Sequence, residues 1–313
     1  MKPLRIGTRA SALARWQAES VQAQLGKLGC AAALVLIRTS GDQDRQTPLR
    51  LLGGKGVFTK EIETALLENR VDVAVHSMKD LPTSLPEGLM IGAICRREDV
   101  RDALVSRAKL GLNDLPRRAR VGTSSLRRQA QLRNRRPDLE MADVRGNVDT
   151  RLAKVDRGEY DAVVLAKAGL DRLGMAGCIT EVLAPEVCLP AAGQGAIGIE
   201  TRAPANNLDR EILIALGQLN DAPTRLAVDA ERAVLAGLSG GCDVPLGVWA
   251  REESGQFAVD ACVLSVDGTE AVRVHRAGLP RDAEAIARDV TAALLQGGAD
   301  RLLALGEQSR GGA

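Results

Sequence analysis

The stretch "LRIGTRASALARWQAESVQAQLGKLGCAAALVLIRT" (residues 4–39) decides the fold class. Short apolar runs at its two ends are typical of β-strands, and Ser11 stands where a helix N-cap is expected. The apolar residues that follow recur at helical spacing along one face: Leu13, Trp16, Val21, Leu25 and Leu28. This alternation of strand and helix continues to about residue 200. It predicts an α/β fold of parallel sheets with helices on their faces.

The length of 313 residues exceeds what one hydrophobic core usually supports, so two or three domains are expected. We expect domain 1 at residues 1–95 together with 196–215, because the glycine-rich "GQGAIGIE" (193–200) can carry the chain back. Domain 2 is expected at 96–195. Residues 216–313 contain three strand patterns followed by a helix pattern, which predicts a small α+β third domain.

Composition narrows the class of protein. The six cysteines are scattered without a C-x-x-C pair, which indicates reduced thiols and a cytoplasmic location. The two histidines stand far apart, so no metal site is expected. No apolar run approaches the ~20 residues of a membrane helix, and the N-terminus lacks the apolar core of an export signal. We therefore expect a globular protein that is neither exported nor bound to a membrane.

Positive charge is concentrated between residues 117 and 136, a segment with eight arginines and no acidic residue. Such a segment usually forms a solvated face or contacts nucleic acid. The chain has only two Phe, two Trp and one Tyr, too few for base stacking. Within the segment, Thr123, Ser124 and Ser125 precede Arg127 and Arg128 at a predicted strand–helix junction, which favours a site for carboxylate or phosphate. The alternative is a capped helix with a basic solvent face.

The segment "VDVAVHSMKDLPTSLP" (71–86) places Lys79 and Asp80 where a predicted parallel strand ends, the edge at which open α/β sheets bind ligands. A surface ion pair is an equally good interpretation. His76 fits a hydrogen-bonded core residue better than a catalyst. Further basic residues follow other predicted strands: Arg9, Arg145 and Arg151.

Two glycine-rich segments complete the candidate sites. Residues 40–59, with "GGKGVF" at 53–58, are too long for an ordinary connection and are interpreted as a mobile functional loop. Cys242 follows two glycines in "LSGGCDVP" (238–245) and is a candidate nucleophile. By itself, a buried structural cysteine is the more common alternative.

Seven blocks, taken in order, resemble the porphobilinogen deaminase family, whose members are also called hydroxymethylbilane synthases. They are "IGTRASALA", "GGKGVFTKEIE", "VAVHSMKDLP", "VGTSSLRRQAQL", "VRGNVDTRL", "LPAAGQGAIGIE" and "GGCDVPLG". The resemblance runs from residue 4 to about 250 and is weaker to the C-terminus. It implies two domains with the fold of periplasmic binding proteins and a cleft between them, plus the small α+β C-terminal domain.

The resemblance also implies the chemistry. Four porphobilinogen molecules are joined head to tail with release of ammonia, giving hydroxymethylbilane for tetrapyrrole (haem) biosynthesis. A dipyrromethane cofactor is attached to Cys242 through a thioether, Asp80 is the catalytic residue, and Lys55 and Phe58 belong to a lid. No metal is implied, and a monomer is expected. The residues implied to bind cofactor and substrate carboxylates are Arg9, Ser11, Lys79, Thr123, Ser125, Arg127, Arg128, Arg145, Arg151 and Arg172.

Two other classes of protein remain as alternatives. A non-catalytic anion-binding protein of the periplasmic type shares the two-domain fold, but it needs an export signal and has no use for Cys242. An arginine-dependent RNA binder would use residues 117–136 and bind with a steep salt dependence. A covalent pigment that reacts with a pyrrole reagent distinguishes the enzyme from both.

Overall fold

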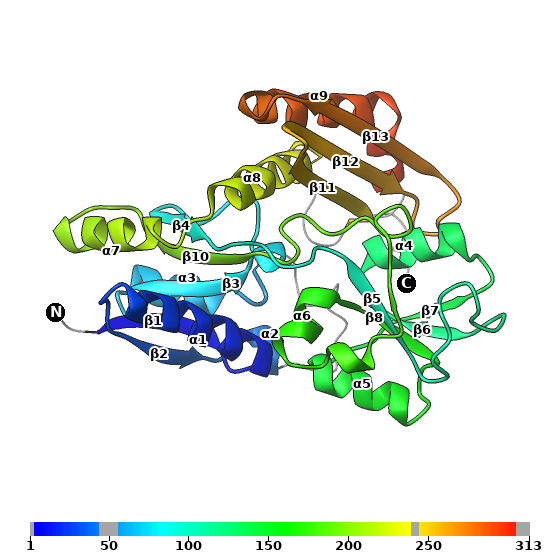
Figure 1. Ribbon diagram of the computed structural model, residues 1–313, viewed down its shortest axis with the longest axis horizontal. Coiled ribbons are helices and arrows are strands. Elements are labelled where there is room, and N and C mark those ends of the chain that lie inside the picture. Colours follow the sequence, from blue (N-terminus) through cyan, green and yellow to red (C-terminus); the bar gives the residue numbers. More distant parts are fainter. Residues whose placement is uncertain (1–2, 44–55, 239–243, 305–313) are drawn as a thin grey trace. The chain divides into compact units, whose positions relative to one another are not determined.

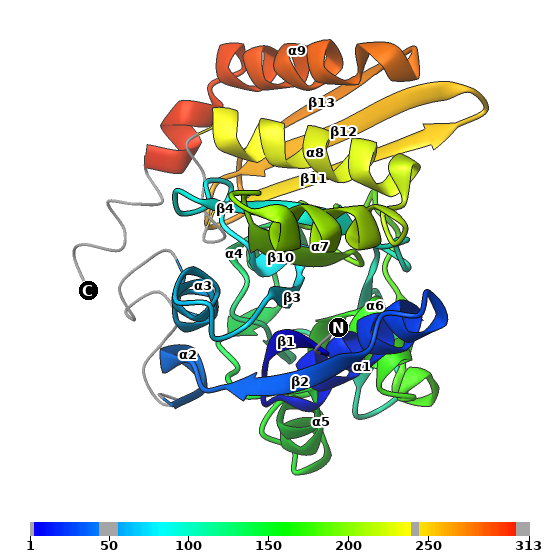
Figure 2. The same ribbon diagram turned by 90° about the vertical axis from the view of Figure 1, so that its left-hand side faces the viewer.

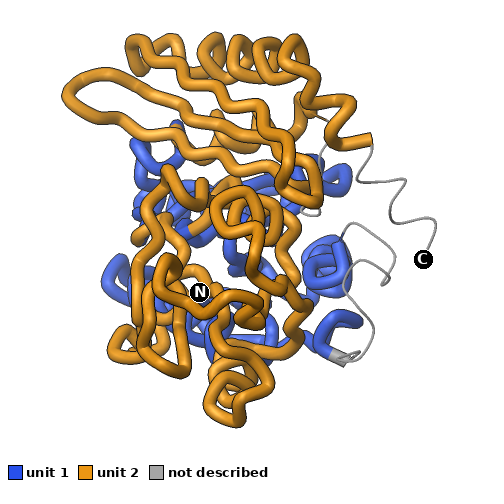
Figure 3. The backbone as a smooth tube through the Cα atoms, turned by 90° about the vertical axis from the view of Figure 1, so that its right-hand side faces the viewer, with its two compact units in different colours: residues 1–98, 195–226 blue, residues 99–194, 227–313 orange. Residues whose placement is uncertain are grey.

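The computed structural model describes residues 3–43, 56–238 and 244–304. The chain divides into two compact units, residues 1–98 with 195–226 and residues 99–194 with 227–313 (Figure 3). Each unit is built around a five-stranded sheet, and the second also contains a three-stranded sheet. The α/β class is therefore confirmed, while the three-domain boundaries stay a prediction.

The sheet of unit 1 has the strand order β2-β1-β3-β10-β4 (Figure 1). Its strands are β1 (Leu4–Arg9), β2 (Ala32–Ile37), β3 (Val73–Ser77), β4 (Leu89–Ile94) and β10 (Ile197–Arg202). Strand β1 is parallel to β2 and β3, whereas β10 runs antiparallel to both β3 and β4. The expected return of the chain near residue 196 is confirmed. The sheet is mixed and not purely parallel, because the returning strand β10 enters from the opposite direction.

Helices cover both faces of this sheet. They are α1 (Ala12–Lys27), α2 (Ser40–Gln43), α3 (Lys60–Leu67) and α7 (Asn207–Gly217). Val21 and Leu25 of α1 pack with Val73 and Val75 on one face. On the other face, Ile62, Ala65 and Leu66 of α3 pack with Ala74. Trp16 and Leu28, which were expected on the buried stripe of α1, are 36% and 40% exposed, since the stripe is narrower than the sequence pattern indicated.

Unit 2 contains a sheet of related topology, with the order β7-β6-β8-β5-β9. Its strands are β5 (Asp102–Ser106), β6 (Arg120–Gly122), β7 (Glu140–Ala142), β8 (Ala162–Ala166) and β9 (Glu181–Val182). Strand β6 is parallel to β7 and β8, and β5 is antiparallel to β8. The helices of this part are α4 (Leu126–Arg135), α5 (Val148–Asp156) and α6 (Lys167–Arg172). This sheet is therefore also mixed.

The C-terminal part has the expected three strands and a helix. An antiparallel meander of β11 (Leu246–Glu253), β12 (Gln256–Leu264) and β13 (Ala271–Gly278) carries α9 (Ala283–Gln296), which lies along β12 and β13 (Figure 2). Helix α8 (Ala222–Gly237) connects unit 1 to this part of unit 2. Short 3-10 helices η2 (Met78–Asp80), η3 (Ala176–Cys178) and η4 (Pro280–Asp282) complete the described elements. Over the three described ranges, no helix is both long and apolar enough to cross a membrane.

Candidate active site

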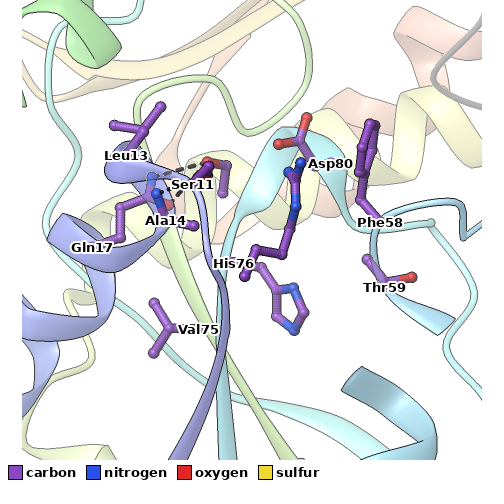
Figure 4. Close-up of a pocket in the computed structure, with 11 residues that line it drawn as sticks. Ser11, Leu13, Ala14, Gln17, Phe58, Thr59, Val75, His76 and Asp80 are labelled. Atoms are coloured by element: carbon purple, nitrogen blue, oxygen red, sulfur yellow. Dashed lines mark hydrogen bonds between the residues drawn. The ribbon is translucent and has the colours of Figure 1, made fainter. Parts of the chain in front are cut away.

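A pocket in unit 1 lies where β1 and β3 end and α1 and α3 begin (Figure 4). These two strands are parallel, so their carboxyl ends meet at one edge of the sheet, as ligand sites in open α/β sheets require. The pocket is lined by Arg9, Ser11, Leu13, Ala14, Gln17, Phe58, Thr59, Val75, His76, Ser77 and Asp80. The structure thus brings together four residues that the sequence singled out separately: Arg9, Ser11, Phe58 and Asp80.

Arg9 is held in a fixed direction at the end of β1. Its Nε and Nη2 donate to the carboxylate of Asp42 over 3.1 and 2.5 Å, and its guanidinium stacks on Phe58 with 4.0 Å to the ring centroid. Burial alone would raise the pKa of Asp42, but hydrogen bonding and attraction by Arg9 outweigh it and lower that pKa. Asp42 is therefore ionised at neutral pH, and the guanidinium plane is oriented before any ligand arrives.

Helix α1 adds polar groups to the pocket. Ser11 is confirmed as its N-cap, because the hydroxyl accepts from the backbone N–H of Ala14 over 3.4 Å. Two turns further along, Gln17 Nε2 donates to the hydroxyl of Ser77 over 2.9 Å. Sequence reasoning missed Gln17 as a pocket residue, although a buried polar residue on the expected apolar face of α1 was a usable signal.

Asp80 lies at the end of η2, the single turn that follows β3. Its side chain is exposed and points into the pocket, whereas Met78 beside it is 1% exposed and anchors the turn. The backbone N–H of Met78 donates to the carbonyl of Ala196 over 3.0 Å. Lys79 is half-buried and does not line this pocket. The anchored turn therefore holds the carboxylate of Asp80 at the pocket, while the side chains of Met78 and Lys79 do not line it.

In unit 2, Arg127 and Arg128 of α4 are only 4% and 6% exposed. Arg127 Nη1 and Arg128 Nη2 each donate to the carboxylate of Asp102 over 2.7 Å, and Gln194 Nε2 donates to it over 2.8 Å. Burial would raise the pKa of Asp102, but the two guanidinium groups hold that pKa far below its usual range. The alternative of a basic solvent face is wrong for these two arginines, since both are buried. Their binding of ligand carboxylates stays a prediction.

The other predicted ligands of unit 2 follow β6, β7 and β8. Thr123 is fully buried, and its hydroxyl accepts from the backbone N–H of Ser125 over 3.3 Å. Ser125 is the N-cap residue of α4 but makes no capping bond through its side chain. The hydroxyl of Ser124 instead joins the segment after β6 to the segment after β7. It donates to the carbonyl of Val144 over 2.9 Å and accepts from the N–H of Val144 over 3.0 Å.

Three arginines complete this group. Arg145 is half-buried in the connection after β7, and Arg151 on α5 donates from Nε to the carbonyl of Gly146 over 2.8 Å. Arg172 on α6 is 8% exposed. All three lie beyond the carboxyl ends of β7 and β8, the sheet edge at which a ligand is expected.

Two of the predicted site residues, Lys55 and Cys242, lie outside the described residues, as does most of the predicted lid loop at 40–59. Residues 40–43 of that loop form α2. The described donors can still be compared with a dipyrromethane, a two-pyrrole cofactor whose rings carry carboxylates. The oriented guanidinium of Arg9 and the hydroxyl of Ser125, which makes no capping bond to α4, are donors suited to carboxylates. The chemistry of these donors therefore fits that cofactor.

Asp102 is the main functional candidate that sequence reasoning missed. It opens the apolar strand "DALVS", and an acidic residue there was a signal that a buried cation lay nearby. Among the described residues, no group of three or more His, Cys, Asp or Glu side chains could hold a metal ion.

Comparisons with known proteins match most of the chain to one family. The model of the porphobilinogen deaminase dipyromethane cofactor binding domain matches residues 4–210, and the model of the C-terminal domain of porphobilinogen deaminase matches residues 225–296. A porphobilinogen deaminase from Syntrophobacter fumaroxidans is 50% identical over 302 residues, which are 96% of each chain.

Solved structures with a similar arrangement come from other classes of protein. The periplasmic VFT2 domain of Bordetella pertussis BvgS is 15% identical, with 69% of this chain and 86% of that chain covered and a TM-score of 0.41. An arginine-specific periplasmic binding protein from Salmonella typhimurium is 14% identical, with 70% and 93% covered and a TM-score of 0.40. The two family models and the near full-length relative decide the identity: this chain belongs to the porphobilinogen deaminase family.

Proposed function

We propose that Asp80 is the catalytic acid/base in the reaction of this family, the polymerisation of four porphobilinogen molecules into hydroxymethylbilane. The observation that supports this role is the position of its carboxylate, exposed on a buried turn in a pocket that Arg9 and Ser11 also line. Loss of ammonia leaves an electron-poor carbon on the substrate, and attack by the next pyrrole leaves a proton to be removed. One carboxylate can stabilise the first species and accept the proton from the second.

Charge accounts for the groups around Asp80. Each porphobilinogen carries two carboxylates, so the growing product accumulates negative charge. A guanidinium whose plane is already fixed loses little conformational entropy when it binds a carboxylate. Arg9 is such a group, because Asp42 and Phe58 orient it, and its side chain remains 20% exposed. We assign Arg9 and Ser11 to ligand carboxylates and leave the proton transfers to Asp80.

The dipyrromethane cofactor primes the chain onto which substrate is added, and Cys242 is our proposed attachment residue. Lys79, Thr123 and Ser125 are proposed to bind carboxylates of cofactor, substrate or product, with the five arginines of unit 2: Arg127, Arg128, Arg145, Arg151 and Arg172. Lys55 and Phe58 are proposed to belong to a lid. The location proposed from family membership and scattered thiols is the cytoplasm, and the proposed assembly is a monomer that does not bind nucleic acid.

Asp80→Asn tests the central assignment, because it keeps shape and hydrogen bonding but removes charge and basicity. Single-turnover rates should fall by roughly 100- to 10,000-fold, the usual contribution of a general acid/base, while substrate affinity changes little. Asp80→Glu should retain partial activity. Asp289→Asn, an exposed carboxylate on α9, serves as the matched control. Chain elongation by Asp80→Asn at the parental rate would remove Asp80 from the mechanism.

A further inference from the structure

Two ionisable side chains meet inside unit 1, on the face of the sheet that α3 covers. In the antiparallel pairing of β3 with β10, His76 lies opposite Gly198, so Glu200 is its diagonal neighbour on the same face. His76 Nε2 lies 3.1 Å from Glu200 Oε2, and their side chains are only 4% and 0% exposed. A carboxylate buried to this degree is costly unless an opposite charge or a proton compensates it.

Helix α3 contributes a third ionisable group, Glu63, which is 7% exposed. Burial raises the pKa of Glu63 and the charges of Glu200 and Glu61 raise it further, while Thr59 and His76 act in the opposite direction; the net pKa is raised. Glu63 therefore binds a proton more readily than a glutamate in water does. Among the residues of β10, the cation on this face is Arg202, two positions beyond Glu200.

Arg202 is engaged away from the cluster. Its Nη1 donates to the carbonyls of Leu66 and Val71, and its Nε contacts Asp209 over 3.3 Å. It is therefore committed to the C-terminal end of α3, and does not neutralise the cluster of Glu63, His76 and Glu200.

Several atoms of this cluster are buried without other hydrogen bonds. Within the described residues, both carboxylate oxygens of Glu200, Oε1 of Glu63 and Nε2 of His76 have no hydrogen-bond partner beyond the close approach of His76 and Glu200. No arrangement of such side chains in the described ranges suits a metal ion. Protons on the three groups themselves can compensate the charge. Two protons, beyond the one that a neutral imidazole already carries, make one imidazole and two carboxylates neutral.

We propose that Glu200, His76 and Glu63 share these protons and thereby fix the end of β3, which makes His76 a positioning residue for Asp80. The inference rests on the proposed role of Asp80. Figure 4 shows the His76 ring pointing away from Asp80, on the side of Thr59, so His76 acts through the backbone and not by direct contact.

The remaining contacts at this strand end show how the end of β3 is held against β10. Met78, between His76 and Asp80, is bound to Ala196 through its backbone N–H, and its Sδ lies where a Cβ on Gly198 would come within 2.2 Å. The strand end is thus held against β10 by packing as well as by the cluster. Both contacts lie on the face that α3 covers, because Gly198 and Glu200 are two residues apart on β10. Glu63 extends these contacts to the start of α3, one turn from the pocket residue Thr59.

The proton on His76 can be measured directly, because the chain has only two histidines. His275 on β13 has a side chain 58% exposed and provides an internal reference. In 15N-histidine-labelled protein we expect a proton bound to Nε2 of His76, with slow exchange, at neutral pH. Glu200→Gln should shift this signal strongly and leave that of His275 in place. A His76 Nε2 that carries no proton in the parent protein would overturn the proposal.

Activity tests the positioning role. His76→Leu should lower turnover by up to about 100-fold, the cost of a displacement near 1 Å, with KM changed less than about threefold, because none of the side chains proposed to bind ligand carboxylates is removed. His76→Gln keeps a nitrogen donor toward Glu200 and should recover much of the loss. His275→Gln is the matched control and should match the parent. Full turnover by His76→Leu would refute positioning.

The two proposals fail in different ways. If Asp80→Asn elongates normally while the His76 proton is present, the role of Asp80 is wrong and with it the positioning of that residue. If Asp80→Asn is inactive while His76→Leu is fully active, only the positioning role is wrong. The spectrum of Asp80→Asn should show the parental His76 signal in either case, because Asp80 is not part of the cluster.

Discussion

Asp102→Asn tests the strongest electrostatic feature of unit 2. The carboxylate of Asp102 is fully buried, and it accepts charge-assisted hydrogen bonds from Arg127 and Arg128 at 2.7 Å each. An amide removes the negative charge and turns an N–H₂ group toward at least one guanidinium. Two lost charge-assisted bonds at about 1.5–3 kcal/mol each agree with the ~3–5 kcal/mol that breaking a buried ion pair costs.

We therefore expect the free energy of unfolding of unit 2 to fall by about 4 kcal/mol. With an m-value of about 2 kcal/mol/M, this lowers the urea midpoint by roughly 2 M. Trp249 on β11 reports on this unit, because it packs against the buried cluster that contains Ala130 of α4, and a Trp16→Phe background removes the tryptophan of unit 1. Asp289→Asn, whose pair with Arg276 is exposed, should stay within about 0.5 kcal/mol of the background.

The pH dependence gives a second measurement on the same variant. Folding lowers the pKa of Asp102 from its unfolded value of 3.8. The ionised carboxylate therefore contributes fully to the free energy of unfolding above pH 3.8, and this contribution is lost as the pH falls toward the pKa of the folded state. The loss in free energy of unfolding caused by Asp102→Asn should be constant from pH 7 to pH 5 and shrink below pH 4. An unchanged urea midpoint at pH 7 would refute a stabilising role for the buried network.

Four further outcomes are expected. Gly198→Ala should destabilise unit 1 by about 1–3 kcal/mol, since the new Cβ would lie 2.2 Å from Met78 Sδ; thermal melts of the variant check this. The pKa of Glu63 is raised in the folded state, so its contribution to the free energy of unfolding is fully present below pH 4.5 and is lost as the pH rises through the folded-state pKa. Glu63→Gln, which does not ionise, should therefore gain stability relative to the parent from pH 5 to pH 8 in urea titrations. Burial and nearby negative charge raise the pKa of Cys188 to about 12, so iodoacetamide at pH 8 should label this thiol only after unfolding, as peptide mapping will show. Intact active protein should exceed its sequence mass by one dipyrromethane, and Cys242→Ser should lose the addition; an unmodified mass in active protein would contradict the attachment.

Local sequence patterns were enough to predict the helices and strands of residues 4–39 and the candidate residues at their ends. The strand–helix–strand pattern of residues 4–39, the N-cap at Ser11 and the position of Asp80 just beyond β3 are all observed. They could be predicted because capping and hydrophobic periodicity depend on residues a few positions apart. Long sequence blocks resembling a known family supplied the chemistry, which periodicity does not encode.

The tertiary structure alone decided the strand directions and the charge partners. Strands β10 and β5 enter their sheets antiparallel, a choice made by where the connecting chain arrives and not by strand sequence. The sequence favoured an anion site at Arg127 and Arg128, with a basic solvent face as the alternative, and only the fold showed that Asp102 lies against both of them. His76 meets Glu200 only through the pairing of β3 with β10. The physical reason is that a charged residue can be buried only where a compensating group is brought to it, and that group here comes from a distant part of the chain.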